Sequence, residues 1–151
     1  MDEPLVTIRL AANADRRSLA ELMKEFYAEE HLRYTPEVER AAAQLLDTPG
    51  LGVCGLIYAD TTLAGYTVLC FGYSLEFHGR FGLLDELYVR PAFRRKGIGN
   101  LALEWAVAYC QREGIGALRL EVDRLNTLAL SLYERAGFTS AGRDYLTRWI
   151  R

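Results

Sequence analysis

The chain has 151 residues, of which 50% are hydrophobic, and a formal net charge of −2 at pH 7. This length suits one well-filled core, so we expect a single domain over residues 1–151. The near-neutral charge gives no global attraction to nucleic acid or to an anionic membrane, and no apolar run reaches the ~20 residues of a membrane span. With no signal-peptide pattern at the start, the sequence predicts a soluble, cytoplasmic protein.

The three cysteines, Cys54, Cys70 and Cys110, lie in apolar runs without Cys-x-x-Cys spacing. Such cysteines are typical of buried free thiols in a reducing compartment. The two histidines, His31 and His78, are far apart and have no neighbouring ligand cluster. We therefore expect no metal site.

Patterns in the first fifty residues predict one strand and two helices. Val6–Leu10 alternates apolar and polar residues, as a half-buried strand does. Asp15 is a candidate cap for a helix with apolar residues at positions 19, 22, 23 and 26. Thr35 followed by Pro36 predicts the start of a second helix, which ends before Gly50.

The rest of the chain predicts a meander and then alternating helices and strands. Residues 53–58, 63–76 and 81–89 are β-like runs separated by turn residues, which favours an antiparallel meander. Expected next are a helix over 97–113, a strand over 117–122, a helix over 127–136, and strands near 138–140 and 144–150. The expected fold is a single α/β domain with a mixed, mostly antiparallel sheet of about seven strands and about four flanking helices.

The stretch 94–100 reads Arg-Arg-Lys-Gly-Ile-Gly-Asn between a predicted strand and a predicted helix. A helix start directs unpaired N–H groups and the positive end of its dipole toward an anion. Gly97 and Gly99 lack Cβ atoms, so phosphate oxygens can approach the backbone, and the three preceding cations add positive charge. The stretch predicts a phosphorylated ligand.

Two other phosphate-binding motifs fit less well. A P-loop requires Lys-Ser or Lys-Thr after its last glycine, whereas Ile98 follows Gly97. The dinucleotide pattern Gly-x-Gly-x-x-Ala is satisfied through Ala102, and Glu121 stands where a ribose-binding acid is expected. However, residues 90–96 separate the strand from the first glycine, and a meander precedes it, so this alternative is the weaker one.

Two motifs resemble the Gcn5-related N-acetyltransferase (GNAT) family. Residues 94–99 fit its Arg/Gln-x-x-Gly-x-Gly/Ala signature, and the segment DELYVRPAFRRKGIG resembles its fourth strand and pyrophosphate loop. Downstream, Asn126 with ALSLYERAGF resembles the second motif, and the strand LAGYTVL follows the family order. The resemblance covers nearly the whole chain and implies acetyl-CoA as cosubstrate.

The resemblance also implies roles for matching residues. The backbone of residues 87–89 would pair with the pantetheine arm, the N–H groups of residues 95–100 would hold the pyrophosphate, and Asn126 would hold the pantetheine end. Tyr133, whose ordinary pKa of ~10 keeps it protonated at pH 7, would protonate the leaving thiolate. The expected cofactor-binding residues are Leu87, Tyr88, Val89, Arg94, Arg95, Lys96, Gly97, Ile98, Gly99, Asn100 and Asn126.

Asp85 and Glu86 are candidates for the base that deprotonates the amine. They interrupt an otherwise apolar strand, and strand neighbours face opposite sides unless a bulge intervenes. Polyamine-acetylating members carry Glu-Asp here, and this chain has the reverse order. We favour Glu86 for its reach, with Asp85 as the amine-binding partner or alternate base, and either acting directly or through water.

The acceptor is expected to be a small primary amine. Residues 26–34 and 73–77 combine aromatic side chains with the acids Glu29, Glu30 and Glu76, a composition that suits a cation. A protein lysine or N-terminus is the alternative acceptor, and a non-catalytic CoA-binding module is the alternative function. The run 144–150, which ends in large apolar side chains, is a candidate edge for a homodimer.

Overall fold

A computed structural model describes residues 2–150. Backbone contacts divide the chain into two compact units, one ending at Glu121 and one beginning at Val122. No helix within residues 2–150 is long and apolar enough to cross a bilayer. The first unit carries the sheet and three of the α-helices.

The sheet of the first unit is mixed, with strand order β1-β2-β3-β4-β5. The first four strands are antiparallel neighbours, and β5 runs parallel to β4. The mixed, mostly antiparallel sheet predicted from the sequence is therefore confirmed. The strands are β1 (Val6–Leu10), β2 (Gly52–Ala59), β3 (Thr62–Ser74), β4 (Gly79–Val89) and β5 (Leu118–Leu120).

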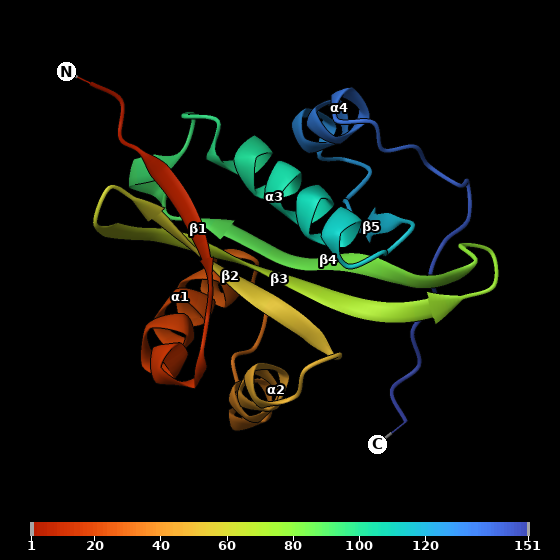
Figure 1. Cartoon of the computed structure of the whole chain (residues 1–151), viewed down its shortest axis with the longest axis horizontal. Helices are drawn as coiled ribbons and strands as arrows, with labels where there is room; N and C mark the ends of the chain where they lie inside the picture. The colour runs from red at the N-terminus through yellow and green to blue at the C-terminus, as the bar shows by residue number, and fades with distance from the viewer. Residues whose placement is uncertain (1, 151) are drawn as a thin grey trace. The chain divides into compact units, whose positions relative to one another are not determined.

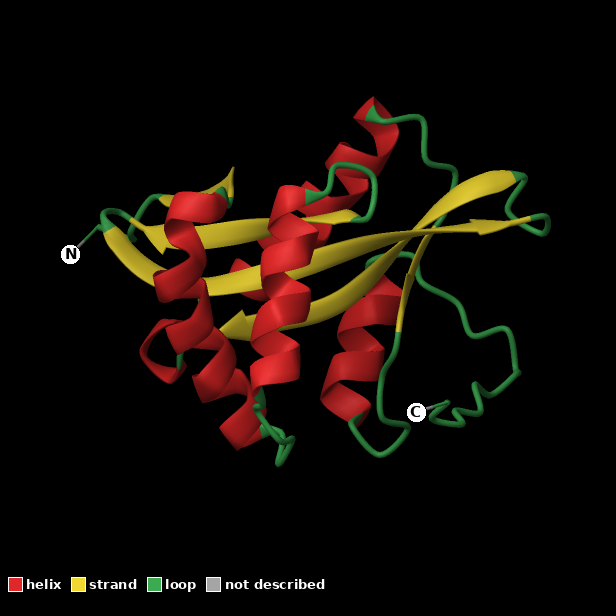
Figure 2. Cartoon of the chain, turned by 90° about the horizontal axis from the view of Figure 1, so that it is seen from below, coloured by secondary structure: helices red, strands yellow, loops and turns green. Residues whose placement is uncertain are grey.

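Helices cover both faces of this sheet. Helices α1 (Arg16–Glu29) and α2 (Pro36–Asp47) lie on one face, and α3 (Ile98–Arg112) lies on the other (Figure 1). Short 3-10 segments, Asn13–Asp15 and Pro91–Phe93, precede α1 and α3. Figure 2 shows β3 and β4 continuing past the other strands as a long twisted ribbon.

Two apolar layers result from the alternation along β3. Tyr66 and Val68 pack with Leu22 of α1, whereas Ala64 and Leu69 face the other side of the sheet, toward α3. Alternation separates Val68 from Leu69. Ala64 faces α3 because β3 has a bulge there: Ile57 pairs with Gly65 and Tyr58 with Leu63, so Ala64 has no partner in the ladder. We call the first layer the α1-side core and the second the α3-side core.

The predicted helix starts are observed, although the Asp15 side chain does not cap α1. Asp15 is the N-cap of α1, but its carboxylate accepts hydrogen bonds from Arg9 and from the backbone N–H of Ala12. Thr35 and Pro36 begin α2 as predicted. In α3, Leu101 is 41% exposed, whereas Leu103 is 1% exposed and belongs to the buried face.

The two strands predicted near 138–140 and 144–150 are wrong. Residues 138–150 form no strand, and the described residues contain five strands rather than seven. Gly142, at φ +70°, breaks the segment, and its large side chains are exposed, with Leu146 at 95% and Ile150 at 90%. An alternating pattern becomes a strand only where a neighbour completes its hydrogen bonds. The homodimer expected from this segment stays a prediction.

The cysteines are free thiols, as predicted. Cys54 and Cys110 are buried, and Cys70 is partly buried. Burial raises the pKa of Cys54 to about 12 and that of Cys70 to about 11, so both keep their protons at neutral pH. Within residues 2–150, no group of three or more histidine, cysteine, aspartate or glutamate side chains is arranged to hold a metal ion.

Candidate functional site

A β-bulge interrupts β4 at Asp85. Val68 of β3 pairs with Glu86, whereas the next residue, Leu69, pairs with Leu84, so Asp85 has no partner across the ladder. One extra residue in a strand bends it and shifts the side-chain alternation by one position. The bulge therefore decides which face each carboxylate occupies.

Both carboxylates lie on the α1 side of the sheet because of this shift. Before the bulge, Leu83 pairs with Cys70, which packs against the α1-side core, so alternation places Asp85 on that face as well. After the bulge, Glu86 pairs with Val68 of the same core. Two consecutive carboxylates thus share one face, which a regular strand forbids.

Two phenols hold Glu86. Tyr27 of α1 donates a hydrogen bond to Glu86 Oε2 at 2.6 Å, and Tyr66 of β3 donates to Oε1 at 2.7 Å. The Thr67 hydroxyl donates to the Glu86 carbonyl at 2.9 Å. Desolvation and then the Glu86 carboxylate raise the pKa of both phenols, so they remain donors at neutral pH. Each carboxylate oxygen of Glu86 is thus already an acceptor.

Asp85 has a different environment from its neighbour. Its carboxylate makes no hydrogen bond to any residue from 2 to 150, although part of its surface remains accessible. Desolvation raises its pKa above the ordinary aspartate value, and the negative charges of Glu86 and Glu121 add to the increase. A carboxylate with a raised pKa and free oxygens is suited to accept a proton.

The glycine-rich stretch forms a left-handed turn that leads into α3. Arg95 and Gly97 have φ values of +64° and +75°, and the first helical hydrogen bond runs from the Leu101 N–H to the Gly97 carbonyl. The N–H groups of residues 98–100 consequently have no acceptor inside the helix. A Cβ atom at Gly97 or Gly99 would meet no other atom within 4 Å. The space beside the helix start is therefore open, and the predicted anion site stays a prediction.

The end of β4 has an open side next to this turn. Leu87, Tyr88 and Val89 pair with β3 on one side. On the other side, β5 pairs only with residues 82–84, so the last part of β4 has no strand neighbour there within the first unit. An extended ligand can add to such an edge as a strand would.

Four charged side chains connect α1 to this region, and the sequence reasoning missed two of them, Glu25 and Arg90. Arg94 donates from Nε to the Val89 carbonyl and from Nη2 to both carboxylate oxygens of Glu29. Arg90 pairs in the same way with Glu25, at 2.8 Å. Glu25 and Glu29 are four residues apart on α1 and so lie on one face of the helix, as their partners Arg90 and Arg94 are four residues apart in the chain.

Lys96 and the candidate acceptor-binding residues have different neighbours in the structure. Lys96 Nζ lies 5.9 Å from the centre of the Phe93 ring. Of the candidate acceptor-binding residues, Glu29 is taken by Arg94, whereas Glu30 is exposed. Phe77 stacks edge-on against Phe81 in the hairpin. The first unit thus brings together the carboxylate pair, the edge of β4 and the glycine-rich turn.

Helix α4 (Thr127–Arg135) of the second unit carries the other two predicted residues. Asn126 is its N-cap, because the side-chain oxygen accepts a hydrogen bond from the Ala129 N–H at 3.1 Å. The Tyr133 ring packs edge-on against Phe138 at 6.1 Å. Desolvation raises the pKa of Tyr133 above 10, so its hydroxyl keeps the proton at pH 7.

Comparisons with known proteins agree with this arrangement. Residues 16–138 match the Acetyltransferase (GNAT) family. The chain is 29% identical over 150 residues to thialysine N-epsilon-acetyltransferase of Bos taurus, with 87% of this chain and 83% of that protein covered. It is 33% identical over 86 residues to streptothricin acetyltransferase of Streptomyces lavendulae, covering 57% of this chain and less than half, 43%, of that protein.

A solved structure shows the same fold over nearly the entire chain. An integron cassette protein from the mobile metagenome of Cole Harbour Salt Marsh superposes with a TM-score of 0.84 and 36% identity, covering 95% of this chain and 90% of that one. Family match and fold lead to the same assignment. The chain belongs to the GNAT family of N-acetyltransferases, which implies acetyl-CoA as its acetyl donor.

Proposed function

We propose that the chain transfers the acetyl group of acetyl-CoA directly to a primary amine of a small molecule. The observation that carries this proposal is the bulge that sets Asp85 and Glu86 on one face of the sheet. An alkylamine with a pKa of ~10.4 is neutral in only about one molecule per few thousand at pH 7. Paired carboxylates attract the ammonium form, and one of them removes its proton.

Asp85 takes the role of the base, and Glu86 holds the positive charge of the arriving amine. The phenols of Tyr27 and Tyr66 already occupy both oxygens of Glu86 and fix their direction. Asp85 makes no such bonds, and its raised pKa brings it nearer to the working pH. This division reverses the preference for Glu86 that reach alone suggested.

The cosubstrate fits the glycine-rich turn and the open edge of β4. Open space at the Cβ positions of Gly97 and Gly99 leaves room for the pyrophosphate against the N–H groups of residues 95–100. The backbone of residues 87–89 aligns the pantetheine arm, and Asn126 holds its thiol end. Acetyl-CoA supplies the thioester.

Two side chains handle the protons of the transfer. Asp85 accepts the proton from the amine, whose nitrogen then bonds to the carbonyl carbon as the carbon–sulfur bond breaks. Tyr133 gives its hydroxyl proton to the departing sulfur, which its raised pKa keeps available at pH 7. The second proton of the amine nitrogen returns to the Tyr133 phenolate, and Asp85 releases its proton to water. One acetylated amine and one free thiol result.

The small-amine assignment has a direct test. Purified protein with acetyl-CoA is offered thialysine, streptothricin, and peptides with a free N-terminus or an internal lysine, and products are identified by mass spectrometry. We expect a kcat/KM for a small amine at least 100-fold above that for either peptide. The opposite ranking would assign the chain to protein acetylation.

A further inference from the structure

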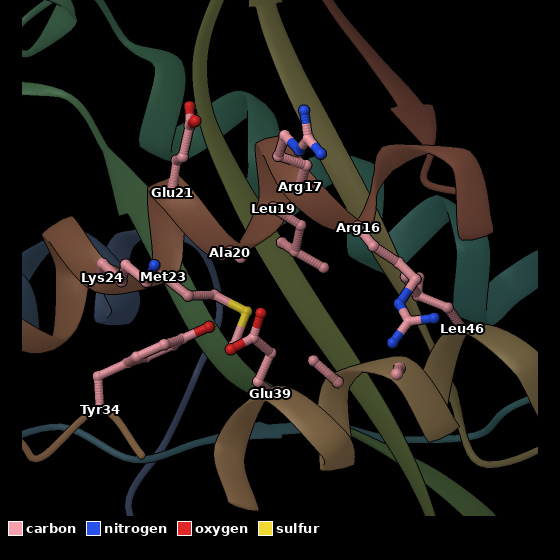
Figure 3. A pocket seen from close by; sticks show the side chains of 12 residues that line it. Arg16, Arg17, Leu19, Ala20, Glu21, Met23, Lys24, Tyr34, Glu39 and Leu46 are labelled. Atoms are coloured by element: carbon pink, nitrogen blue, oxygen red, sulfur yellow. The ribbon is translucent and has the colours of Figure 1, made fainter. Parts of the chain in front are cut away.

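A cavity of about 310 Å³ lies between α1 and α2, apart from the site described above. Its twelve lining residues come from α1, α2 and the connection between them, and none belongs to β4 or to the glycine-rich turn (Figure 3). The volume is at the small end of the ~300–1,000 Å³ typical of ligand pockets. The cavity is large enough for a small organic molecule.

One end of the cavity contains a hydroxyl that needs a partner. The Tyr34 hydroxyl is buried and has no hydrogen-bond partner among the described residues. Desolvation raises the pKa of Tyr34, and the nearby Glu39 carboxylate adds to the increase, although no hydrogen bond of normal geometry joins the two. An unsatisfied buried hydroxyl destabilises the fold, so a polar group bound here would be stabilising.

The other end of the cavity has the opposite charge. Figure 3 shows the Arg16 guanidinium toward Leu46, away from Glu39 and Tyr34. Arg16 is exposed and makes one long hydrogen bond, 3.5 Å to the side chain of Asn13, so its guanidinium is available to a ligand. Between the two ends the lining includes the apolar side chains of Leu19, Ala20 and Met23. Arg17, Glu21 and Lys24 also line the cavity, and Lys24 Nζ lies 5.6 Å from the centre of the Tyr34 ring.

We propose that this cavity is a second binding site, for a short aliphatic ω-amino acid. The ammonium group of the ligand binds the Glu39 carboxylate, and its carboxylate pairs with Arg16. The methylene chain between them packs on Leu19. The ammonium also donates a hydrogen bond to the Tyr34 hydroxyl oxygen beside Glu39. A ligand with both charges at opposite ends matches the order acid, apolar wall, base along the cavity better than a singly charged one does.

Two aromatic rings, those of Tyr34 and Tyr27, connect this site to the carboxylate pair. Tyr34 packs edge-on against Tyr27, with ring centres 5.8 Å apart and planes at 90°. Tyr27 in turn donates the hydrogen bond to Glu86. A ligand held at Tyr34 therefore modulates acetyl transfer, and this second part of the inference rests on the proposed function.

Calorimetric titration of the full chain without acetyl-CoA tests the binding site on its own. The probes are 6-aminohexanoate, hexylamine and hexanoate. We expect 6-aminohexanoate to bind at least tenfold more tightly than either singly charged probe, and Glu39→Gln and Arg16→Gln each to weaken it at least tenfold. Glu37→Gln, on the same helix but outside the cavity and paired with Arg40, is the matched control and leaves binding unchanged.

Each contrary result would overturn one of three claims: the binding site, its effect on acetyl transfer, or the proposed function. No heat of binding up to 50 mM, equal binding of hexylamine, or full binding by both cavity variants would overturn the site. If binding occurs but saturating 6-aminohexanoate leaves kcat and KM for the acetylated amine unchanged, the modulation is wrong and the site stands. If no amine is acetylated at all, the proposed function fails while the titration still decides the site.

Discussion

The carboxylate of Glu29 on α1 holds the guanidinium of Arg94, whose Nη2 lies 2.8 and 2.6 Å from its two oxygens. Arg94 is also the first residue of the signature that leads into the glycine-rich turn. A cation expected to face the phosphates is thus neutralised by an acid of the neighbouring helix. We therefore expect acetyl-CoA binding and this ion pair to compete for the same guanidinium.

We predict that Glu29→Gln lowers the Kd for acetyl-CoA about two- to fivefold. The pair is about 40% exposed on both sides, so its loss costs little stability, whereas a freed guanidinium gains a charge-assisted hydrogen bond to phosphate. Titration calorimetry at low and high salt measures the change. Glu30→Gln, at the next position, serves as control, and weaker binding by Glu29→Gln would mean that the pair positions the turn instead.

Gly99→Ala should separate binding from folding. The added Cβ meets no protein atom within 4 Å, and alanine favours a helix over glycine, so we expect equal or slightly higher thermal stability. The same Cβ enters the space assigned to the pyrophosphate, and we expect at least tenfold weaker acetyl-CoA binding. Gly116→Ala, where the new atom makes an ordinary 3.5 Å contact, should leave binding intact. Unchanged affinity in Gly99→Ala would move the pyrophosphate elsewhere.

Asp85→Asn tests the base. The raised pKa of Asp85 means that kcat/KM falls as pH decreases through that value, and the variant should lose this limb together with about 10²–10⁴ in kcat. Glu104→Gln, exposed on α3, is the control. A variant Asp85→Asn with full kcat, beside an inactive Glu86→Gln, would return the base role to Glu86.

Asp85→Asn should raise the stability of the fold at neutral pH, although it lowers the activity. A carboxyl whose folded-state pKa is above its unfolded value destabilises the fold once it ionises, because the folded chain binds the proton more tightly. Stability from this group is present at low pH and is lost as pH rises through the two pKa values. Asp85→Asn should therefore raise Tm at pH 7 and leave it unchanged near pH 3, as calorimetric melting can measure.

Tyr66→Phe should destabilise the chain by about 1–3 kcal/mol, because the buried Glu86 oxygen loses its donor. Tyr66 is 0% exposed, so water has no access to replace the phenol. Urea unfolding measures the shift in midpoint at constant m-value. Tyr73→Phe, 74% exposed in the hairpin, is the control and should not move the midpoint. Equal midpoints for both variants would indicate that Glu86 finds another donor.

Tyr133→Phe tests the acid. We expect kcat to fall about 10- to 100-fold with little change in KM, because the ring still packs on Phe138 while the proton donor is gone. Steady-state kinetics from pH 6 to 9 provide the measurement. Retention of full kcat across that range would remove Tyr133 from the mechanism.

The helices, the meander and the turn were predictable because local rules determine them. Val6–Leu10 and the start of α2 match the sequence prediction to the residue, since alternation and a Thr-Pro start are local signals. The segment 138–150 has an equally local pattern, but a strand also needs a neighbour, which no pattern in the segment itself supplies.

The candidate site was predictable by residue and not by geometry. Asp85 and Glu86 stand out as acids in an apolar strand, yet only the pairing with β3 locates the bulge that puts them on one face. The donors Tyr27 and Tyr66 come from positions distant in sequence, and the ion pairs of α1 depend on how it packs. Tertiary contacts of this kind leave no short-range signature.

The bulge at Asp85 makes the chemistry of β4 depend on a single extra residue in the strand. In a chain lacking that one position, β3 and β4 would pair as an uninterrupted ladder, with a straighter ribbon and without the carboxylate of Asp85. Such a protein would melt at a higher temperature and would have no carboxylate pair on its inner face. We therefore expect selection for stability to favour a β4 without the extra residue, and selection for acetyl transfer to favour the present length.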